Sequence, residues 1–270
     1  MRFTKMHGNG NDFVVVEAKD LPAGGATPAL CARLAHRQFG IGCDQVLVVE
    51  PSATADFRMR IFNNDGSEVE MCGNGIRCFA RYVFERGLTK KTKLNIETLA
   101  GIIVPEIIGE QVKVDMGAPR LKTADWVYPE EKTLKRPLRI GGETFEITLV
   151  SMGNPHCVIF VPEITDHHVL EVGPQIERHP DFPRKINVEF IQVLDRRTLK
   201  MRVWERGSGE TLACGTGATA ASHAAWLNGL AESSVAVQLK GGTLQLDLGA
   251  DGHRHMTGPA TFVFTGDFQL

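Results

Sequence analysis

Two segments of the sequence, residues 63–75 and 205–217, repeat one pattern around a cysteine. In both segments a glutamate stands four residues before the cysteine (72 − 68 and 214 − 210), and Gly-x-Gly follows the cysteine. A thiol at a glycine-rich helix start is a candidate nucleophile or acid–base group. Two such thiols, Cys72 and Cys214, indicate a symmetric reaction, in which a proton leaves one face of a carbon and returns to the other.

The start of a helix suits both halves of that chemistry. A thiol has a pKa of roughly 8.5, and the positive end of a helix favours the thiolate. The backbone N–H groups at the same place can hold a carboxylate, and glycines allow its close approach. Such a grip also stabilises the negative charge that develops when an α-proton leaves. One cysteine is then thiolate and the other thiol when turnover begins, and the roles exchange in the reverse direction.

Other readings of these motifs remain open at this point. Cys-Gly-x-Gly is also compatible with a structural capping turn. The pairs Gly8-x-Gly10 and Gly73-x-Gly75 resemble part of a nucleotide-binding motif, but neither is completed and no Walker motif occurs. A cysteine hydrolase needs one cysteine with a histidine partner such as His156, which leaves the second cysteine copy unexplained.

The cysteine count and spacing predict neither a disulfide scaffold nor a metal site. Six cysteines in 270 residues are sparse for a disulfide framework, and Cys-x-x-Cys is absent from the sequence. We interpret the other four as small buried side chains. These are Cys31, Cys43, Cys78 and Cys157.

Composition restricts the class of protein. Hydrophobic residues make up 43 %, enough for sizeable cores, and 30 basic against 32 acidic residues leave a net charge of −2. That balance argues against a nucleic-acid binder driven by phosphate neutralisation. No stretch approaches the roughly 20 apolar residues of a membrane span, and the N-terminus lacks the apolar run of a signal peptide. We therefore expect a cytoplasmic protein without nucleic-acid or membrane partners.

The repeat extends beyond the cysteine loops. Residues 10–16 resemble residues 153–159, and the asparagines of these segments lie 61 and 60 residues before the two cysteines. Two similar halves predict two similarly folded domains with a ligand cleft between them. We assign residues 1–115 plus 260–270 to the domain that carries Cys72, and 116–259 to the domain that carries Cys214.

Strand signals outnumber helix signals in both halves. Helices are expected over Pro28–Arg37, capped by Thr27, and over Gly75–Glu85 and Gly217–Asn228. The expected strands are Phe13–Glu17, Gln45–Glu50, Phe57–Asn63, Leu94–Thr98, Val112–Met116, Glu143–Val150, Val158–Val161, Val188–Leu194, Leu199–Glu205, Ser234–Leu239 and Thr243–Leu248. The fold class is thus α/β (α+β): two pseudo-symmetric domains from an internal duplication, each a strongly curved, barrel-like sheet around a central helix.

Several motifs along nearly the whole chain point to one family. They are Lys5-Met6-His7-Gly8-x-Gly10-Asn11-Asp12-Phe13, Gly42-x-Asp44-Gln45, Phe62-Asn63-x-Asp65-Gly66-Ser67-Glu68, Met71-Cys72-Gly73-Asn74-Gly75-x-Arg77-Cys78, Met152-Gly153-Asn154-Pro155-His156, Ile186-Asn187-Val188, Glu205-Arg206-Gly207-x-Gly209-Glu210-Thr211 and Ala213-Cys214-Gly215-Thr216-Gly217. Together they resemble the diaminopimelate epimerase family. Asn9 and Cys43 are mild departures at positions to which we assign no chemistry.

The resemblance implies an isomerase that interconverts LL- and meso-2,6-diaminopimelate, in lysine and peptidoglycan precursor biosynthesis. It implies no pyridoxal phosphate or other cofactor, no metal, and a homodimer. The strand Thr261–Phe264 is our candidate for part of the dimer contact.

Site roles carried over from the resemblance fall into two groups. Cys72 and Cys214 are the expected acid–base pair, tuned and oriented by Glu205 and His156. The expected substrate-binding residues are Asn11, Gln45, Asn63, Gly73, Asn74, Asn154, Asn187, Arg206, Gly215 and Thr216. Among these, the Gly73-Asn74 and Gly215-Thr216 pairs are expected to present N–H groups to the α-carboxylate, and the asparagines and Arg206 to hold the distal end. From the sequence alone, Asn187 reads more readily as a turn residue.

Some charged residues of the motifs are expected to be structural. Glu68 and Glu210 are interpreted as loop-structuring residues, because an acid would repel the substrate carboxylate. Asp12, Asp65 and Arg77 are interpreted as scaffold.

Three rival hypotheses accompany this reading. A two-thiol epimerase acting on proline, hydroxyproline or another amino acid shares the chemistry but does not need polar residues for a second amino-acid head. A related isomerase of the same fold would lack the cysteine pair. A catalytically silent binding or scaffold protein would not need two intact cysteine loops.

Overall fold

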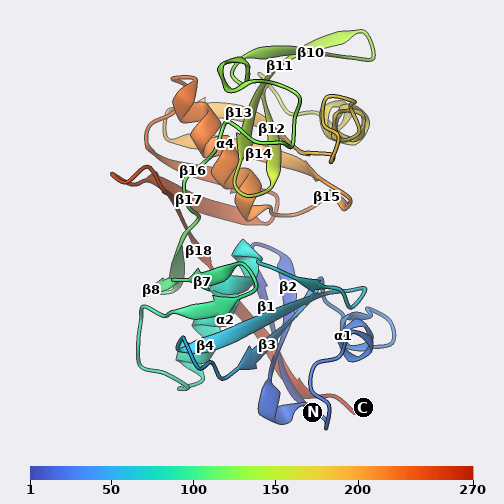
Figure 1. Ribbon diagram of the computed structural model, residues 1–270, viewed down its shortest axis with the longest axis vertical. Helices are drawn as coiled ribbons and strands as arrows, with labels where there is room; N and C mark the ends of the chain where they lie inside the picture. The colour runs from blue at the N-terminus through green and yellow to red at the C-terminus, as the bar shows by residue number, and fades with distance from the viewer. Residues whose placement is uncertain (270) are drawn as a thin grey trace. The chain divides into compact units, whose positions relative to one another are not determined.

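The computed structural model describes residues 1–269. The chain divides into two compact units, drawn in Figure 1. The first contains Met1–Asp115 and the chain from Thr257 onward, and the second contains Met116–Met256.

The first unit contains the chain's N-terminal strands and two α-helices. Its elements are β1 (Arg2–Gly8), β2 (Asn11–Glu17), a 3-10 turn (Ala18–Asp20), α1 (Pro28–Ala35), β3 (Gln45–Glu50), β4 (Phe57–Asn63), β5 (Glu68–Val69), α2 (Gly73–Glu85), β6 (Ile96–Thr98), β7 (Gly101–Ile103), β8 (Glu106–Ile108), β9 (Gln111–Asp115) and β19 (Thr261–Asp267). The main sheet has the order β19-β1-β2-β3-β4-β6-β7, and β5 pairs with β4. The pairs β2/β3 and β4/β6 are parallel, and the other neighbours are antiparallel.

The second unit repeats this pairing pattern. Its elements are a 3-10 turn (Glu130–Lys132), β10 (Arg136–Ile140), β11 (Glu143–Ser151), β12 (Pro155–Phe160), a π-helical turn (His167–Val172), α3 (Gly173–Glu177), β13 (Asn187–Asp195), β14 (Thr198–Glu205), β15 (Gly209–Glu210), α4 (Gly215–Leu227), β16 (Ser234–Leu239) and β17 (Gly242–Leu248). The order is β10-β11-β12-β13-β14-β16-β17, with β15 on β14. Here β12/β13 and β14/β16 are the parallel pairs. The strand β18 (Arg254–Pro259) carries the chain from the second unit back to the first.

One helix in each unit contacts most strands of its own sheet. Helix α2 contacts β1, β2, β3 and β4, as well as β8 and β9, whereas α4 contacts β11 to β14, β16 and β17. A sheet can meet one helix with so many strands only if it curves around it. The predicted fold class, two mixed-sheet domains with a central helix in each, is confirmed.

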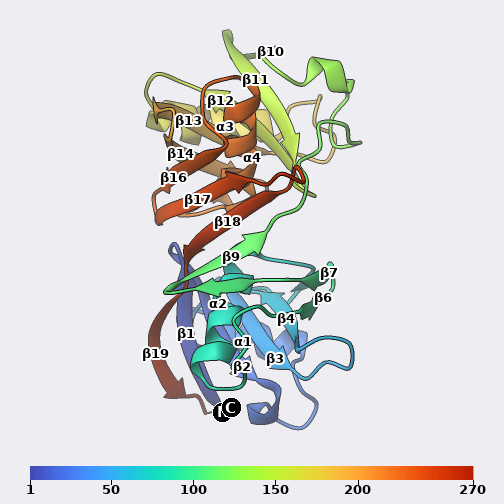
Figure 2. The same ribbon diagram turned by 90° about the vertical axis from the view of Figure 1, so that its left-hand side faces the viewer.

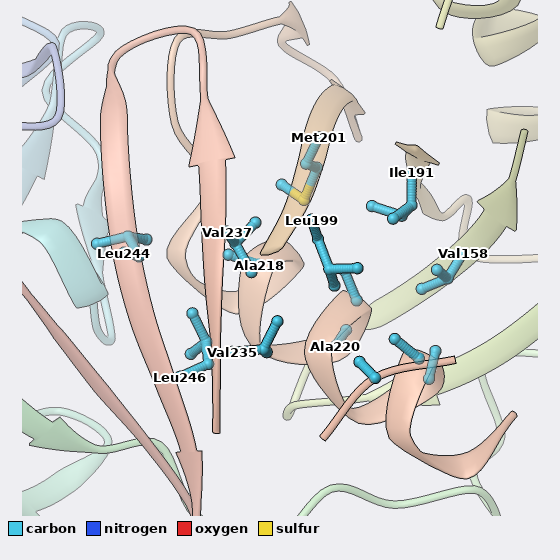
Figure 3. Close-up of a cluster of buried hydrophobic side chains, with 14 of the residues drawn as sticks. Val158, Ile191, Leu199, Met201, Ala218, Ala220, Val235, Val237, Leu244 and Leu246 are labelled. Atoms are coloured by element: carbon cyan, nitrogen blue, oxygen red, sulfur yellow. The ribbon is translucent and has the colours of Figure 1, made fainter. Parts of the chain in front are cut away.

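The core of the second unit explains how its sheet packs so closely on α4. The helix presents a run of buried alanines that includes Ala218 and Ala220. Figure 3 shows strand side chains such as Val158, Leu199 and Leu246 gathered around them. Small side chains on the helix allow the strands to approach its backbone, and burial of each Val or Leu contributes about 1.5–3 kcal/mol.

The helix boundaries differ from the sequence prediction by two residues or fewer. Thr27 caps α1 as expected, its Oγ1 accepting a hydrogen bond from Leu30 N at 3.2 Å. The helix ends at Ala35 rather than Arg37, because the chain turns back and the N–H groups of Ile41 and Gly42 donate to Leu34 O. The two central helices begin earlier than predicted, each at the residue directly after its cysteine.

The strand β19 lies along β1 in the first unit, as Figure 2 shows. The pairing runs from Arg2 opposite Asp267 to His7 opposite Thr261. The N-terminal ammonium of Met1 donates to Phe268 O at 3.0 Å. Over residues 1–269, no helix is long and apolar enough to cross a membrane.

Candidate active site in two halves

Each of the two repeated cysteines is the N-cap of a central helix. Cys72 precedes α2 and Cys214 precedes α4, both with extended backbone angles. The sulfur of Cys72 accepts a hydrogen bond from Gly75 N at 3.4 Å, and that of Cys214 accepts one from Gly217 N at 3.3 Å. An N–H donor and the positive end of a helix both favour a negative sulfur. The glycines that follow each cysteine form the first turn of the helix, and backbone N–H groups in the first turn have no partner within the helix.

The Cys72 half has an asparagine oxygen beside the thiol. Cys72 Sγ lies 3.7 Å from Asn11 Oδ1 in donor geometry, and Asn74 Nδ2 donates to the same oxygen at 3.2 Å. The other end of the Asn11 amide donates to Asp44 Oδ2 at 2.8 Å. The carboxylate of Asp44 therefore fixes the amide with its oxygen toward the sulfur.

Two further predicted binding residues of this half bond to each other. Gln45 Nε2 donates to Asn63 Oδ1 at 2.9 Å, because the two residues face each other across β3 and β4. Asn63 Nδ2 donates to Ser67 Oγ at 3.1 Å within the turn that leads to the cysteine. These amides are half-buried.

The Cys214 half contains a chain of four hydrogen bonds. Thr216 Oγ1 lies 3.5 Å from Cys214 Sγ and accepts from Asn154 Nδ2 at 3.2 Å. Asn154 Oδ1 is 3.0 Å from His156 Nε2, and His156 Nδ1 is 2.7 Å from Glu189 Oε1. The side chains of His156 and Glu189 have no exposed surface. A buried, hydrogen-bonded His156–Glu189 pair thus lies at the inner end of a path that leads to the thiol.

A second carboxylate reaches the same cysteine. Glu205 accepts a hydrogen bond from Thr211 Oγ1 and another from Cys214. Burial raises the pKa of Glu205, and these hydrogen bonds oppose that rise. Burial, followed by the negative charges of Glu205 and Glu189, raises the pKa of Cys214 well above its usual range, although Thr216 and Gly217 N lower it. Cys214 is therefore a thiol in this state at neutral pH.

The other buried cysteines stay protonated as well. Burial raises the pKa of Cys31, Cys43 and Cys78 to about 12, and that of Cys157 well above its usual range. They pack as small buried side chains, as predicted.

Buried side chains hydrogen-bond to the backbone of the turn that carries Arg206. Asn187 Oδ1 accepts from Arg206 N at 2.9 Å, and Asn187 Nδ2 donates to Pro155 O at 2.9 Å. Buried Glu177 accepts from Gly207 N and Trp204 Nε1, both at 2.9 Å. The guanidinium of Arg206 is exposed and donates to Arg184 O at 3.3 Å. Asn187 therefore positions the backbone of Arg206 rather than pointing its amide outward.

The residues expected to be structural have structural partners. Glu68 binds Arg60 through two hydrogen bonds of 2.7 and 2.9 Å, and Glu210 accepts from Arg202 at 2.8 Å. Both pairs link the cysteine loop to the strand before it. Fully buried Arg77 donates to Asn9, Gly73 O and Pro259 O, and so ties α2 to the Gly8–Gly10 turn.

Comparison with known proteins decides the family. The diaminopimelate epimerase family model matches residues 3–122 and 148–263. The chain is 55 % identical to a diaminopimelate epimerase of Moorella thermoacetica, over the full length of both proteins. This chain belongs to the diaminopimelate epimerase family.

Solved structures with lower identity share the fold. A Bacillus anthracis phenazine biosynthesis protein of the PhzF family superposes with a TM-score of 0.71 at 19 % identity, covering 100 % of this chain and 99 % of that one. A hydroxyproline epimerase from Agrobacterium vitis, with trans-4-hydroxy-L-proline bound, gives 0.69 at 15 % identity, covering 98 % and 91 %. At such identities these likenesses show the shared fold alone.

Three residues at the site were given no role by the sequence analysis: Asp44, Glu177 and Glu189. Asp44 lies in one of the quoted motifs, and Glu189 carries a signal of its own, since a carboxylate stands between apolar neighbours in the buried part of β13. Charged residues are rarely buried unless they are paired. Its partner His156 lies 33 residues earlier, and the parallel pairing of β12 with β13 brings the two together.

Proposed function

We propose that Cys72 and Cys214 are the acid–base pair with which this diaminopimelate epimerase interconverts the LL and meso isomers. The epimerase activity, a step of lysine biosynthesis, follows from family membership. The observation that supports the two-thiol mechanism is the repeated geometry: each cysteine caps a helix and its sulfur accepts a backbone N–H.

The proposed reaction moves one proton at each face of Cα. One cysteine, as thiolate, takes the α-proton, so that the Cα–H bond breaks and its electron pair stays on carbon. The other cysteine, as thiol, gives its proton to the opposite face, which forms the new Cα–H bond and leaves a thiolate. The N–H groups of the two helix starts, at Gly73-Asn74 and Gly215-Thr216, hold the α-carboxylate and spread the developing charge.

The remaining groups orient the reactants. Glu205 accepts a hydrogen bond from the Cys214 thiol, and His156 is connected to the same half through Asn154. In this proposal both residues orient and tune the Cys214 thiol. The proposed ligands of the substrate's amino and carboxyl groups are Asn11, Gln45, Asn63, Asn154 and Arg206, with Arg206 suited to the distal carboxylate. Asn187 acts by fixing the Arg206 backbone.

The proposal includes two epimerase domains that each contribute one cysteine, and no cofactor or metal. It also includes a cytoplasmic location, a supply of peptidoglycan precursor, and a homodimer. Strand β19 supports the dimer, because Val263 and Phe264 are about half exposed on a strand at the end of the sheet order. Gel filtration of Phe264→Asp should show a monomer, and an unchanged dimer would remove β19 from the interface.

Proton exchange at Cα tests the mechanism. We would incubate reduced enzyme, without added cofactor, with LL-diaminopimelate in deuterated water and follow isomer composition and α-deuterium by NMR. The expected product is the meso isomer carrying deuterium, and both Cys72→Ala and Cys214→Ala should lose this conversion. Full activity in either variant would overturn the two-thiol mechanism. Exchange with proline or hydroxyproline instead would move the substrate to the rival class.

A further inference from the structure

The direction of the hydrogen bonds in the Cys214 half follows from the His156–Glu189 pair and from the orientation of the Asn154 amide. His156 Nδ1 and Glu189 Oε1 are 2.7 Å apart, a distance that requires a proton between them. His156 Nε2 faces Asn154 Oδ1, which only accepts, so Nε2 carries a proton too. The pair therefore holds two protons and no net charge, whichever atom carries the shared one.

A neutral pair also fits its burial. Neither side chain has any exposed surface, and among the described residues Glu189 Oε2 has no hydrogen-bond partner. An uncompensated carboxylate there would be costly, and more so beside the second carboxylate, Glu205. The titratable groups that face the pair and the thiol are Glu205 from β14, Cys157 from β12 and Cys214 itself.

The two outer links agree with the proton on Nε2. Asn154 turns Oδ1 to His156 and donates from Nδ2 to Thr216 Oγ1 at 3.2 Å. Thr216 Oγ1 lies 3.5 Å from Cys214 Sγ, and its hydroxyl proton is directed to that sulfur. The Cys214 proton is directed to the other side, where Glu205 accepts it.

The corresponding amide of the first unit points the other way. Asp44 takes Asn11 Nδ2, so Asn11 Oδ1 faces Cys72 Sγ. The acceptor Asp44 thus orients the Asn11 amide in the first unit, whereas the donor His156 orients the Asn154 amide in the second.

We propose that Glu189 and His156 are a positioning pair that directs hydrogen bonds, through Asn154 and Thr216, onto the sulfur of Cys214 and so supports its thiolate when it has given up a proton. This role rests on the proposed two-thiol mechanism. It predicts that loss of Glu189 makes the Cys214 thiolate harder to form. Removal of a nearby negative charge alone would make the thiolate easier to form.

The test is the alkylation rate of Cys214 at mildly alkaline pH, which follows the thiolate fraction and needs no turnover. Iodoacetamide labelling resolved by peptide mass spectrometry gives rates for Cys214 and, as an internal standard, Cys72. Glu189→Gln should slow Cys214 about three- to tenfold, the loss of one net hydrogen bond, and leave Cys72 unchanged. Asp125→Asn, which removes another buried carboxylate of the same unit, is the matched control and should leave the Cys214 rate unchanged.

A double-mutant cycle separates the hydrogen-bond path from a simple field effect. Thr216→Val should slow Cys214 alkylation, Thr216→Ser should restore it, and Glu189→Gln should add nothing in the Thr216→Val background. Faster alkylation in Glu189→Gln, or an effect that persists in Thr216→Val, would overturn the proposal. These rates do not depend on whether diaminopimelate is turned over, so failure of the epimerase mechanism would be seen separately.

If Glu189→Gln does not fold, the unmodified protein still gives a decision. In ¹⁵N-histidine-labelled enzyme, the His156 signals, assigned with Thr216→Val, should show a proton on Nε2 across neutral pH. An unprotonated Nε2 would reverse the direction of the path and overturn the inference.

Discussion

The two halves of the molecule share a backbone fold, but the side chains that surround their thiols differ in polarity. Beneath Cys72, at the start of α2, lie Phe13 and Leu47, each within 3.4 Å of where a side chain on Gly75 would begin. The sheet positions that correspond to them in the second unit hold His156 and Glu189. One thiol therefore lies on apolar side chains and the other on a buried, hydrogen-bonded histidine–glutamate pair.

What is shared shows what the fold itself needs. Both cysteine loops are tied to the preceding strand by an arginine–glutamate pair, Arg60 with Glu68 and Arg202 with Glu210. Both helices start directly after the cysteine. The differences lie instead around the thiols, which indicates that the geometry of proton transfer is duplicated while each thiol is tuned separately.

The largest expected effect is on turnover, and it sharpens the comparison. Cys72→Ala and Cys214→Ala should each reduce epimerisation by about 10²–10⁴, the usual weight of an acid–base group. Because each thiol serves one face, residual α-deuterium exchange should favour opposite isomers in the two variants. Single-isomer exchange measured by NMR checks this. The same isomer preference in both variants would mean that the halves do not serve opposite faces.

The second prediction concerns a glutamate introduced in the first unit at the position that corresponds to Glu189. Leu47→Glu buries a carboxylate beside Phe13, without a histidine partner, and should lower the free energy of unfolding by about 3 kcal/mol or more. Urea denaturation measures this. Leu47→Met, which preserves volume, is the control and should cost under about 1.5 kcal/mol. If Leu47→Glu were as mild as the control, the two halves would tolerate charge equally.

The sequence could predict the repeated framework because its signals are local. Each Gly-Asn turn is followed directly by its apolar strand, and each cysteine directly by Gly-x-Gly. The strands that were predicted and the central helices lie close to their observed bounds, whereas β1 and β10 were not predicted. The roles of His156 and Arg206 came instead from the family resemblance, which the motifs Gly-Asn-Pro-His and Glu-Arg-Gly help to carry.

The partners of the thiols could not be predicted in the same way. Glu189 reaches His156 through parallel strand pairing, and Asp44 reaches Asn11 across 33 residues. Glu177 holds the Arg206 turn from a short helix that follows a π-helical turn, and its sequence has no strong period. Such contacts depend on sheet register and crossover packing, which no window of sequence contains.

The third prediction concerns acid stability, which the two halves should not share. Asp12 pairs with Lys5 and Arg37, whereas the corresponding position of the second unit is Pro155. Burial raises the pKa of Asp12, but hydrogen bonds from Arg37 and Lys5 outweigh it and lower the pKa to about 2. A lowered pKa stabilises the fold above the unfolded value near pH 4, and this contribution disappears as pH falls through about 2.

Asp12→Asn should therefore cost about 2 kcal/mol at neutral pH, and the difference from the parent should vanish near pH 2. Denaturation curves across acidic pH check the sign. A difference that stays constant with pH would show that the carboxylate's charge is not what stabilises the first unit.

The smallest expected effect tests how each half holds its cysteine-loop turn. In the first unit the turn is braced internally, with Asp65 Oδ1 accepting from Ser67 N at 2.8 Å. In the second, Glu177 reaches in from α3 to hold Gly207 N and Trp204. Glu177→Gln keeps one acceptor oxygen and loses the other, so the Arg206 turn should loosen by about one net hydrogen bond.

Because Arg206 is proposed to bind the distal carboxylate, away from the reacting carbon, the loss should appear in substrate binding. KM for diaminopimelate should rise about three- to tenfold while kcat changes less than about twofold. Glu171→Gln, an exposed change nearby in the chain, serves as the control. A fall in kcat at constant KM would instead connect Glu177 to the Cys214 thiol, as a third carboxylate beside Glu205 and Glu189 that acts on this sulfur.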